Sequence, residues 1–535
     1  MYLYNARIYT LDELNPMITA LAIDQGRILM CADEATIRAE FGSRMPSVDL
    51  DGGVVIPGLT DAHIHLEHYA LGLQKVDCET STKEECLRRV AERARSAPEG
   101  EWILGHGWNQ NDWAGGYGMA SDLDVVTPHN PVYLTAKSLH AGWANTLALR
   151  LAKIGEATPD PPEGRLGRNE QGGPNGILFE SAMDLITAAI PEPTWQRLEQ
   201  AIQSALPQLW GMGLTSVHDF DRRRCFMALQ SLRHRGELRL RVVKSIPLED
   251  LASALEVGLR SGFGDDWLRI GGVKLFADGA LGPHTGAMFE PYEDDPSNRG
   301  MLFLDGEQIY EFGQQAADGG LPLAVHAIGD RANHEVLNAF ERLRAYEQAK
   351  AETWGQFGEM RLRHRIEHLQ VLNSRDISRL AELGVIASMQ PIHALSDMEM
   401  ADRFWGERAC LAYAWKTQLE EGATLAFGSD APVESPNPFW GLYAAVTRKR
   451  FDGSPGRDGW YPEQRLSRTQ ALQAYTTGPA YAAGWEDRLG KLAPGYLADL
   501  LVLNEDPFTC KPDQLRHIRP RATMIGGEWV YRKEA

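Results

Sequence analysis

Eight short apolar runs alternate with amphipathic stretches through the middle of this 535-residue chain, and that alternation limits the folds open to it. Strand-like runs separated by helix-like stretches are typical of βα units, which build a parallel sheet. Eight such units close naturally into a (β/α)8 TIM-like barrel of the α/β class, and a doubly wound sheet is the alternative. The expected strands are Val54–Asp61, Leu214–Asp219, Leu240–Ile246, Ile270–Phe276, Pro322–Ala327, His364–Gln370, Val385–Gln390 and Thr424–Ser429.

The two ends of the chain differ from this middle because they carry short strands and hairpin turns. We expect residues 1–56 and 485–535 to form one small β-sandwich domain, since neither end alone has enough strands for a stable core. Residues 57–484 then form the barrel. The segment at about 77–180 contains four tryptophans and turns rich in Gly and Pro, and it does not fit the βα repeat. It is expected to be an insertion that covers the active site.

The amino-acid composition limits the kinds of partner that we expect this protein to bind. The net charge is −19, from 54 Lys and Arg against 73 Asp and Glu, which argues against nucleic acid or an anionic membrane as a partner. Six scattered cysteines without a CxxC pair do not suggest a disulfide framework or a thiolate zinc site. The sequence shows neither a signal peptide nor a long apolar span. We expect a cytoplasmic protein that acts on a small molecule, and the question of a homodimer stays open.

Histidine, lysine and aspartate side chains stand at the ends of the expected strands. His63 and His65 form a His-x-His pair after the first apolar run, and residues i and i+2 of a strand project to the same face. The carboxyl ends of barrel strands converge on one site, and imidazoles with a carboxylate suit Zn²⁺ or a neighbouring first-row ion. Each residue alone has an ordinary structural explanation, but together they favour a metal site. The further candidates are Lys274, His326, His368 and Asp430.

Several longer motifs carry a family resemblance. They are PGLTDAHIHL at 57–66, GHGWNQNDW at 105–113, HAGWANTLAL at 140–149, VKLFADGALG at 273–282, VHAIGDRAN at 325–333, RIEHLQ at 365–370 and GSDAPVESPNPFWGLYAAVTR at 428–448. With these motifs the sequence resembles the amidohydrolase superfamily, and within it the amidohydrolase-3 branch of YtcJ-like metal-dependent hydrolases. The resemblance runs over nearly the whole chain.

The resemblance implies a centre of two divalent metal ions, with zinc as the expected metal. In it, His63, His65 and Asp430 hold the buried ion. The second ion is held by His326 and His368, and an N-carboxylated Lys274 bridges the two. The implied reaction is hydrolysis of a non-peptide C–N bond in an amide, an N-formyl compound or a cyclic amide by a hydroxide between the metals. Asp430 is implied as general base and then general acid.

Substrate contacts are less defined. His140 matches a histidine of the family insertion, and its implied role is a hydrogen bond to the substrate or to the tetrahedral oxyanion. Trp108, Asn109 and Trp113 are expected to line an aromatic pocket, with ordinary loop packing as the alternative. The chain departs from the family after Gly282, where it reads Pro283-His284 in place of the usual Ser-Arg. His284 is therefore a substrate contact, a residue that supports a metal ligand, or a solvated loop residue.

Two other functions stay open. A deaminase on the same scaffold commonly uses one metal, so a bridging Lys274 favours two metals and amide hydrolysis. A non-catalytic regulatory homologue is the other alternative. It has no chemical need for six convergent ligands, which argues against it.

Overall fold

The computed structural model describes residues 1–138, 140–354 and 362–533. The chain divides into two compact units, one made of Met1–Tyr69 with Ile202–Ala535 and the other of Ala70–Ala201. Within the described ranges, no helix is both long and apolar enough to cross a membrane. The boundaries predicted from the sequence for the domains stay predictions.

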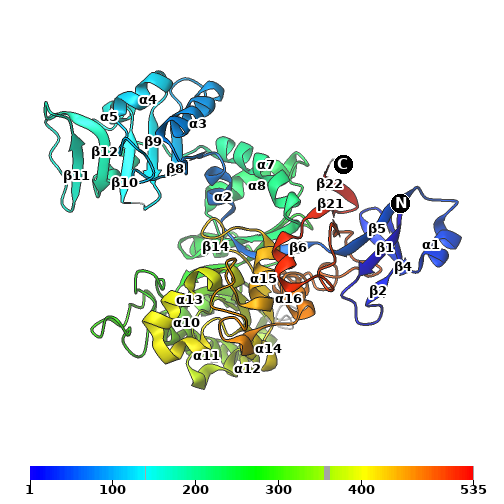
Figure 1. The fold of residues 1–535 in the computed structure, drawn as a ribbon. Coiled ribbons are helices and arrows are strands. Elements are labelled where there is room, and N and C mark those ends of the chain that lie inside the picture. Colours follow the sequence, from blue (N-terminus) through cyan, green and yellow to red (C-terminus); the bar gives the residue numbers. More distant parts are fainter. Residues whose placement is uncertain (139, 355–361, 534–535) are drawn as a thin grey trace. The chain divides into compact units, whose positions relative to one another are not determined.

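A nearly closed barrel of eight parallel strands forms the centre of the first unit, as the alternating pattern predicts (Figure 1). Each strand pairs in parallel with its neighbour. In their order around the barrel the strands are β6 (Leu59–Ile64), β13 (Leu214–Asp219), β14 (Arg241–Pro247), β15 (Leu268–Phe276), β16 (Leu323–Ala327), β17 (Arg365–His368), β18 (Ile386–Met389) and β19 (Leu425–Phe427). Their side chains are mostly buried, as expected where helices cover a parallel sheet.

Helices follow these strands along the chain. Ser467 caps α16 by accepting a hydrogen bond from the backbone N–H of Gln470. The helices of this unit are α1 (Glu34–Phe41), α8 (Arg223–His234), α9 (Leu251–Glu256), α10 (Gly306–Asp318), α11 (Asp330–Trp354), α12 (Arg379–Leu383), α13 (Pro391–Trp405), α14 (Trp415–Glu420), α15 (Pro438–Thr447), α16 (Arg468–Ala474) and α17 (Thr477–Ala483). The helices α2 (Leu66–Gly72) and α7 (Trp195–Gly211) run across the limits of the two units.

The barrel closes between its first and last strands through residues that were predicted as metal ligands. The backbone N–H of Asp430 donates to the carbonyl of His63 at 2.7 Å, and the N–H of His65 donates to the carbonyl of Ala431 at 2.9 Å. Gly428 allows this approach, since a Cβ there would lie 2.5 Å from the His63 nitrogen. Closure of the fold and placement of these side chains therefore depend on the same segment.

The first expected strand, Val54–Asp61, is in fact divided between two sheets. The segment β5 (Ser47–Pro57) belongs to a separate sheet, and the barrel begins with β6 after Gly58. Gly58 packs closely on β13, because a Cβ there would lie 2.3 Å from the hydroxyl oxygen of Thr215. His63 consequently lies inside β6, and only His65 follows the strand end. This change of sheet could not be predicted from the sequence, because the apolar run continues across it without a break.

Strands from both ends of the chain form one mixed sheet. β20 pairs antiparallel with β5, which pairs in parallel with β1. The arrangement of this sheet as a β-sandwich stays a prediction. Besides β5 its strands are β1 (Tyr2–Tyr9), β2 (Met17–Ile18), β3 (Ala20–Asp24), β4 (Arg27–Ala32), β20 (Leu500–Leu503), β21 (Pro520–Ile525) and β22 (Glu528–Arg532).

The second unit has a six-stranded mixed sheet and its own apolar core. The sheet order is β11-β12-β10-β9-β8-β7. The strands are β7 (Val76–Asp77), β8 (Ile103–Trp108), β9 (Val132–Ala136), β10 (Ala141–Ala144), β11 (Gly164–Arg168) and β12 (Pro174–Glu180), and the helices are α3 (Lys83–Ser96), α4 (Ala120–Val126), α5 (Thr146–Leu151) and α6 (Met183–Thr187).

A buried ion pair ties the C-terminal strands to the barrel. Arg241, the first residue of β14, donates from Nε and Nη2 to the two carboxylate oxygens of Asp499 at 2.6 and 2.8 Å. Both side chains are almost fully buried. Asp499 also accepts the backbone N–H of Gly526 in the β21–β22 turn. The pair therefore links a barrel strand, the start of β20 and a hairpin of the terminal sheet.

We predict that Asp499→Asn lowers the free energy of unfolding by about 3–5 kcal/mol, because it leaves a buried guanidinium without its counter-charge. Urea unfolding followed by circular dichroism measures this change. Glu34→Gln, which breaks the exposed pair with Arg38 on α1, is the control and should leave the unfolding midpoint unchanged. A loss below about 1 kcal/mol for Asp499→Asn would show that the pair does not hold the two parts together.

Candidate metal centre

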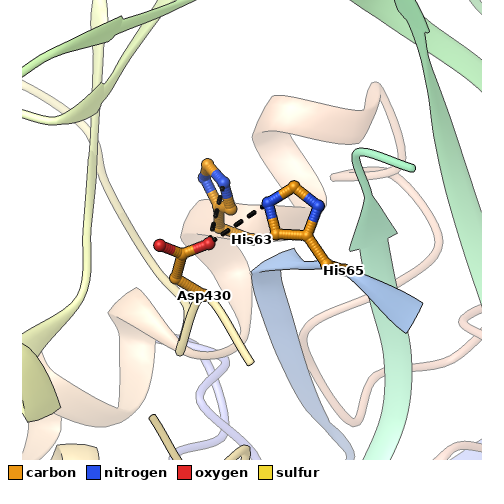
Figure 2. A group of neighbouring side chains, drawn as sticks. All are labelled: His63, His65 and Asp430. Carbon is orange, nitrogen blue, oxygen red and sulfur yellow. Dashed lines mark ion pairs between the residues drawn. The ribbon is translucent and has the colours of Figure 1, made fainter. Parts of the chain in front are cut away.

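Three predicted ligands meet at the closing edge of the barrel. Asp430 Oδ1 lies 3.5 Å from His63 Nε2 and 3.3 Å from His65 Nε2, as Figure 2 shows. One ligand atom from each residue lies within 4.8 Å of the other two. Asp430 has a φ of 58°, a left-handed conformation that is uncommon outside glycine and that positions its carboxylate beside both rings. These side chains could hold one metal ion.

The outer nitrogens of these two rings are held by carboxylates. His63 Nδ1 lies 2.6 Å from Glu367 Oε2, and His65 Nδ1 lies 3.1 Å from Asp221 Oδ1. An ionised carboxylate only accepts hydrogen bonds, so each Nδ1 carries the proton and Nε2 is left as the donor atom for a metal. His63 Nε2 is buried and has no hydrogen-bond partner among the described residues. A carboxylate behind the ring is the usual support of a metal-binding histidine.

The second predicted pair is supported in the same way. His368 Nδ1 lies 2.9 Å from the side-chain oxygen of Gln390, which leaves Nε2 for a metal. His326 uses its other nitrogen, because Nε2 lies 2.8 Å from the carbonyl of Gly279 and Nδ1 stays available. The two ring centroids are 4.5 Å apart. The structure therefore brings both histidines together at the ends of neighbouring strands.

Lys274 is buried at 4% exposure without a polar partner. Its Nζ has no hydrogen-bond partner in the described part of the chain and lies 4.7 Å from the ring centroid of Phe220 and 5.0 Å from that of Phe276. Burial lowers the pKa of the amine to about 8. An unpartnered ammonium in this position is costly, so the geometry indicates that a further group normally meets this nitrogen.

Protonation differs among the imidazoles. Burial lowers the pKa of His63 to about 4 and that of His326 to about 3, so both rings are neutral at pH 7. His65 behaves differently, because burial is outweighed by the carboxylates of Asp221 and Asp430, which raise its pKa to about 9. A metal at this position would replace the proton on His65 Nε2, since only a neutral imidazole binds a metal.

A charged network lies behind His63. Burial alone would raise the pKa of Glu367, but the Arg365 guanidinium and His63 hold that pKa well below its ordinary value. Arg365 Nη2 donates to Glu367 Oε2 at 3.1 Å, and the Ser388 hydroxyl donates to the same oxygen at 2.6 Å. Arg365 Nη1 also lies 2.9 Å from His218 Nδ1. Glu367 is therefore ionised, and its contact with Nδ1 orients the His63 ring.

Sequence reasoning missed the supporting residues Glu367, Asp221 and Gln390, and it missed His393. A ligand atom of His393, on α13, lies within 4.8 Å of ligand atoms of His368 and Asp430. Glu367 could have been noticed because it directly precedes a predicted ligand in the RIEH motif. His393 carries no such signal, since it lies beyond the expected strand, in the first turn of a helix.

The predicted substrate contact His284 has other partners. Its Nε2 lies 3.2 Å from Asp294 Oδ1, and its ring packs against Tyr292 and Phe404 at centroid distances of 4.7 and 4.1 Å. These contacts hold the loop between β15 and α10 together and against helix α13, and they do not include a predicted metal ligand. They favour a structural role over substrate binding, which stays a prediction.

The other predicted substrate residues lie in the Ala70–Ala201 unit. The Trp108 and Trp113 side chains are buried in its core, and their N–H groups donate to the carbonyls of Leu134 and Thr80. Asn109 accepts the N–H of Asn111 within a turn. His140 is exposed, with Nδ1 3.0 Å from Glu180 Oε2. This burial favours core packing for the tryptophans, and the predicted substrate roles of these residues and of His140 stay predictions.

An eight-stranded parallel barrel with histidine, lysine and aspartate at its strand ends is an arrangement that suits the class of metal-dependent enzymes built on this fold. Comparison with known proteins agrees. Residues 47–531 match the sequence model described as the amidohydrolase family, and the chain belongs to that family.

Relatives cover nearly the whole chain. The protein LONG AFTER FAR-RED 3 of Arabidopsis thaliana is 33% identical over 98% of this chain and 91% of its own length. The N-substituted formamide deformylase of Arthrobacter pascens is 28% identical over 100% of this chain and 98% of its own. The crystal structure of an uncharacterized metal-dependent hydrolase from Pyrococcus furiosus superposes with a TM-score of 0.78 at 32% identity, covering 95% of this chain and 99% of that one.

We predict that Glu367→Gln weakens zinc affinity by about 10- to 100-fold, because the amide supports the His63 ring less well than the carboxylate. Competition with a chromogenic chelator measures the affinity. Glu347→Gln is a matched control, since Glu347 forms a second buried pair, with His364, away from the ligands. It should alter stability and leave zinc affinity unchanged. Equal zinc affinity in Glu367→Gln and the native protein would refute the supporting role of this carboxylate.

Proposed function

We propose that this protein hydrolyses a C–N bond, other than a peptide bond, in a small-molecule amide, N-formyl compound or cyclic amide, with two zinc ions as cofactors. The observation that carries the proposal is the orientation of the histidine rings. Each of the four predicted histidine ligands has one ring nitrogen held by a protein acceptor and the other left for a metal. The name of the formamide deformylase relative supports this type of bond.

We propose that the ligand set holds two ions, with Lys274 between them. His63, His65 and Asp430 would hold the first ion, and His326 and His368 the second. We propose that Lys274 is N-carboxylated, because its buried amine has no polar partner and a carbamate would supply two anionic oxygens. A depressed pKa favours the modification, since only the neutral amine attacks carbon dioxide. When bound, the ions would lower the pKa of a water molecule at the site and polarise the substrate carbonyl.

The side chains of the protein would then move the protons. The pKa of Asp430 lies well below its ordinary value, because the effect of burial is outweighed by the hydrogen bond from His65 together with the nearby imidazoles of His63, His368 and His393. Its carboxylate is therefore ionised at neutral pH and can accept the proton of the attacking water. The same carboxyl group can next protonate the leaving nitrogen, so that the amine departs as a neutral molecule. The proposal includes a hydrogen bond from His140 to the substrate or to the tetrahedral oxyanion.

The test is a substrate screen on purified protein loaded with zinc. N-acyl, N-formyl and cyclic amides are compared with aromatic amines, and the release of amine and of ammonia is followed separately. Hydrolysis of an amide with release of amine or carboxylate supports the proposal. Release of ammonia from an aromatic base without cleavage of any amide would replace it with the deaminase. A protein that holds no metal would support the regulatory alternative.

We predict that Asp430→Asn lowers kcat by about 10²- to 10⁴-fold, because an amide cannot accept the proton of the attacking water. Metal analysis should show that part of the zinc is kept, since asparagine still offers an oxygen ligand. His140→Ala, the comparison variant, should keep its full zinc content and lower kcat/KM. Near-native turnover by Asp430→Asn on a confirmed substrate would show that another group carries the proton.

A further inference from the structure

An aromatic side chain stands half exposed beside the predicted ligands. Phe276 is the last residue of β15 and follows Lys274 by two, so both project to the same face of the strand. It pairs in register with His326 on β16, and the two ring centroids lie 5.2 Å apart. Lys274 is buried, whereas Phe276 is 48% exposed. The Phe276 ring therefore lies where the cluster of predicted metal ligands meets solvent.

Two more apolar side chains are exposed on the loop that follows β15. The backbone N–H of Phe303 donates to the carbonyl of Ala277 at 2.7 Å, and Leu302 forms a β-bridge with Asp278. Met301 and Phe303, on either side of Leu302, are 51% and 52% exposed. Exposed phenylalanine and methionine grouped along one segment commonly mark a site where an apolar ligand is covered. This segment runs beside the residues that directly follow Phe276.

The charges on the same loop argue for an uncharged ligand. The β15–α10 loop, residues 277–305, contains two basic side chains, and both lie beside carboxylates. His284 is 3.2 Å from Asp294, and Arg299 is 3.7 Å from Glu290. Each is balanced by a neighbouring carboxylate of the loop, which disfavours binding of a carboxylate on a substrate. A cationic group is equally disfavoured, since it would lie near two divalent metal ions.

We propose that Phe276 is a specificity-determining residue that packs against an aryl or long alkyl group of an uncharged amide substrate. The inference rests on the proposed function and names its substrate class. A carbonyl placed between the ligands of β6 and β16 brings the substituents of the amide to the strand ends. Phe276 is the apolar surface that they meet there, and Phe303 can cover them from the loop. Stacking or edge contacts between aromatic rings add to the apolar burial.

The first experiment measures kcat and KM of the zinc-loaded protein on N-methyl, N-butyl and N-(2-phenylethyl) formamide and acetamide. The native protein should prefer the phenylethyl over the methyl compound by about tenfold or more in kcat/KM. Phe276→Ala should raise KM for the phenylethyl compound by about 10- to 30-fold and leave the methyl compound within about twofold. Phe276→Leu should keep most of the activity on the butyl compound.

Two controls separate recognition from a damaged site. Phe263→Ala removes a ring that is 69% exposed before β15, at the opposite end of that strand, and should behave as the native protein. Zinc content should be equal in the native protein, Phe276→Ala and Phe276→Leu. Equal kinetics of Phe276→Ala and the native protein on the phenylethyl compounds would overturn the inference.

A binding measurement separates this inference from the proposed reaction. Acetohydroxamate and 3-phenylpropionohydroxamate chelate zinc and can be titrated calorimetrically without any turnover. The native protein should bind the phenyl compound about tenfold more tightly, and Phe276→Ala should lose that difference. A preference that depends on Phe276, without cleavage of any amide, would support apolar recognition and overturn the proposed hydrolysis. Amide cleavage without such a preference would support hydrolysis and overturn the role of Phe276.

Discussion

The hydrogen bond between Glu367 and His63 is the interaction on which the site depends most directly. It is short, at 2.6 Å, and both side chains are buried, His63 on the first barrel strand and Glu367 on β17. A buried carboxylate is tolerated only when its charge is compensated, and Arg365 and Ser388 supply that compensation. The backbone carbonyl of His63 also accepts the N–H of Asp430, which joins the last strand to the first. The orientation of a candidate metal ligand and the closure of the fold therefore depend on the same residue, His63.

The terminal sheet contributes to the same placement. The chain passes from β5 to β6 through Pro57 and Gly58, so His63 lies six residues beyond the end of a strand in the terminal sheet. The backbone N–H of Gly58 donates to the carbonyl of Asp499, and the Asp499 side chain pairs with Arg241 at the start of β14. These contacts fix where the first barrel strand begins. They are the physical reason why strands from both ends of this chain pack next to its barrel.

Much of this arrangement could be predicted from the sequence. The features that could not be predicted share one physical cause. Apolar periodicity located the eight barrel strands, and the motifs named the candidate ligands His63, His65, His326, His368 and Asp430, which stay predictions as metal ligands. The same periodicity could not show that the run through Gly58 changes sheets, because both halves are apolar. Nor could it separate the buried Trp108 and Trp113 from pocket residues. Supporting residues such as Asp221 were missed because their role depends on a contact with a distant residue of the chain.

Anomalous diffraction from crystals of the zinc-loaded protein, recorded at the zinc absorption edge, tests the central claim most directly. The account predicts two peaks about 3.5–4 Å apart. The first should be bound by Nε2 of His63 and His65 with Asp430, and the second by Nδ1 of His326 and Nε2 of His368, with a carboxylated Lys274 between them. A single peak, coordination through Nδ1 of His63 or His65, or an unmodified Lys274 beside two fully occupied ions would contradict the bridged two-metal centre.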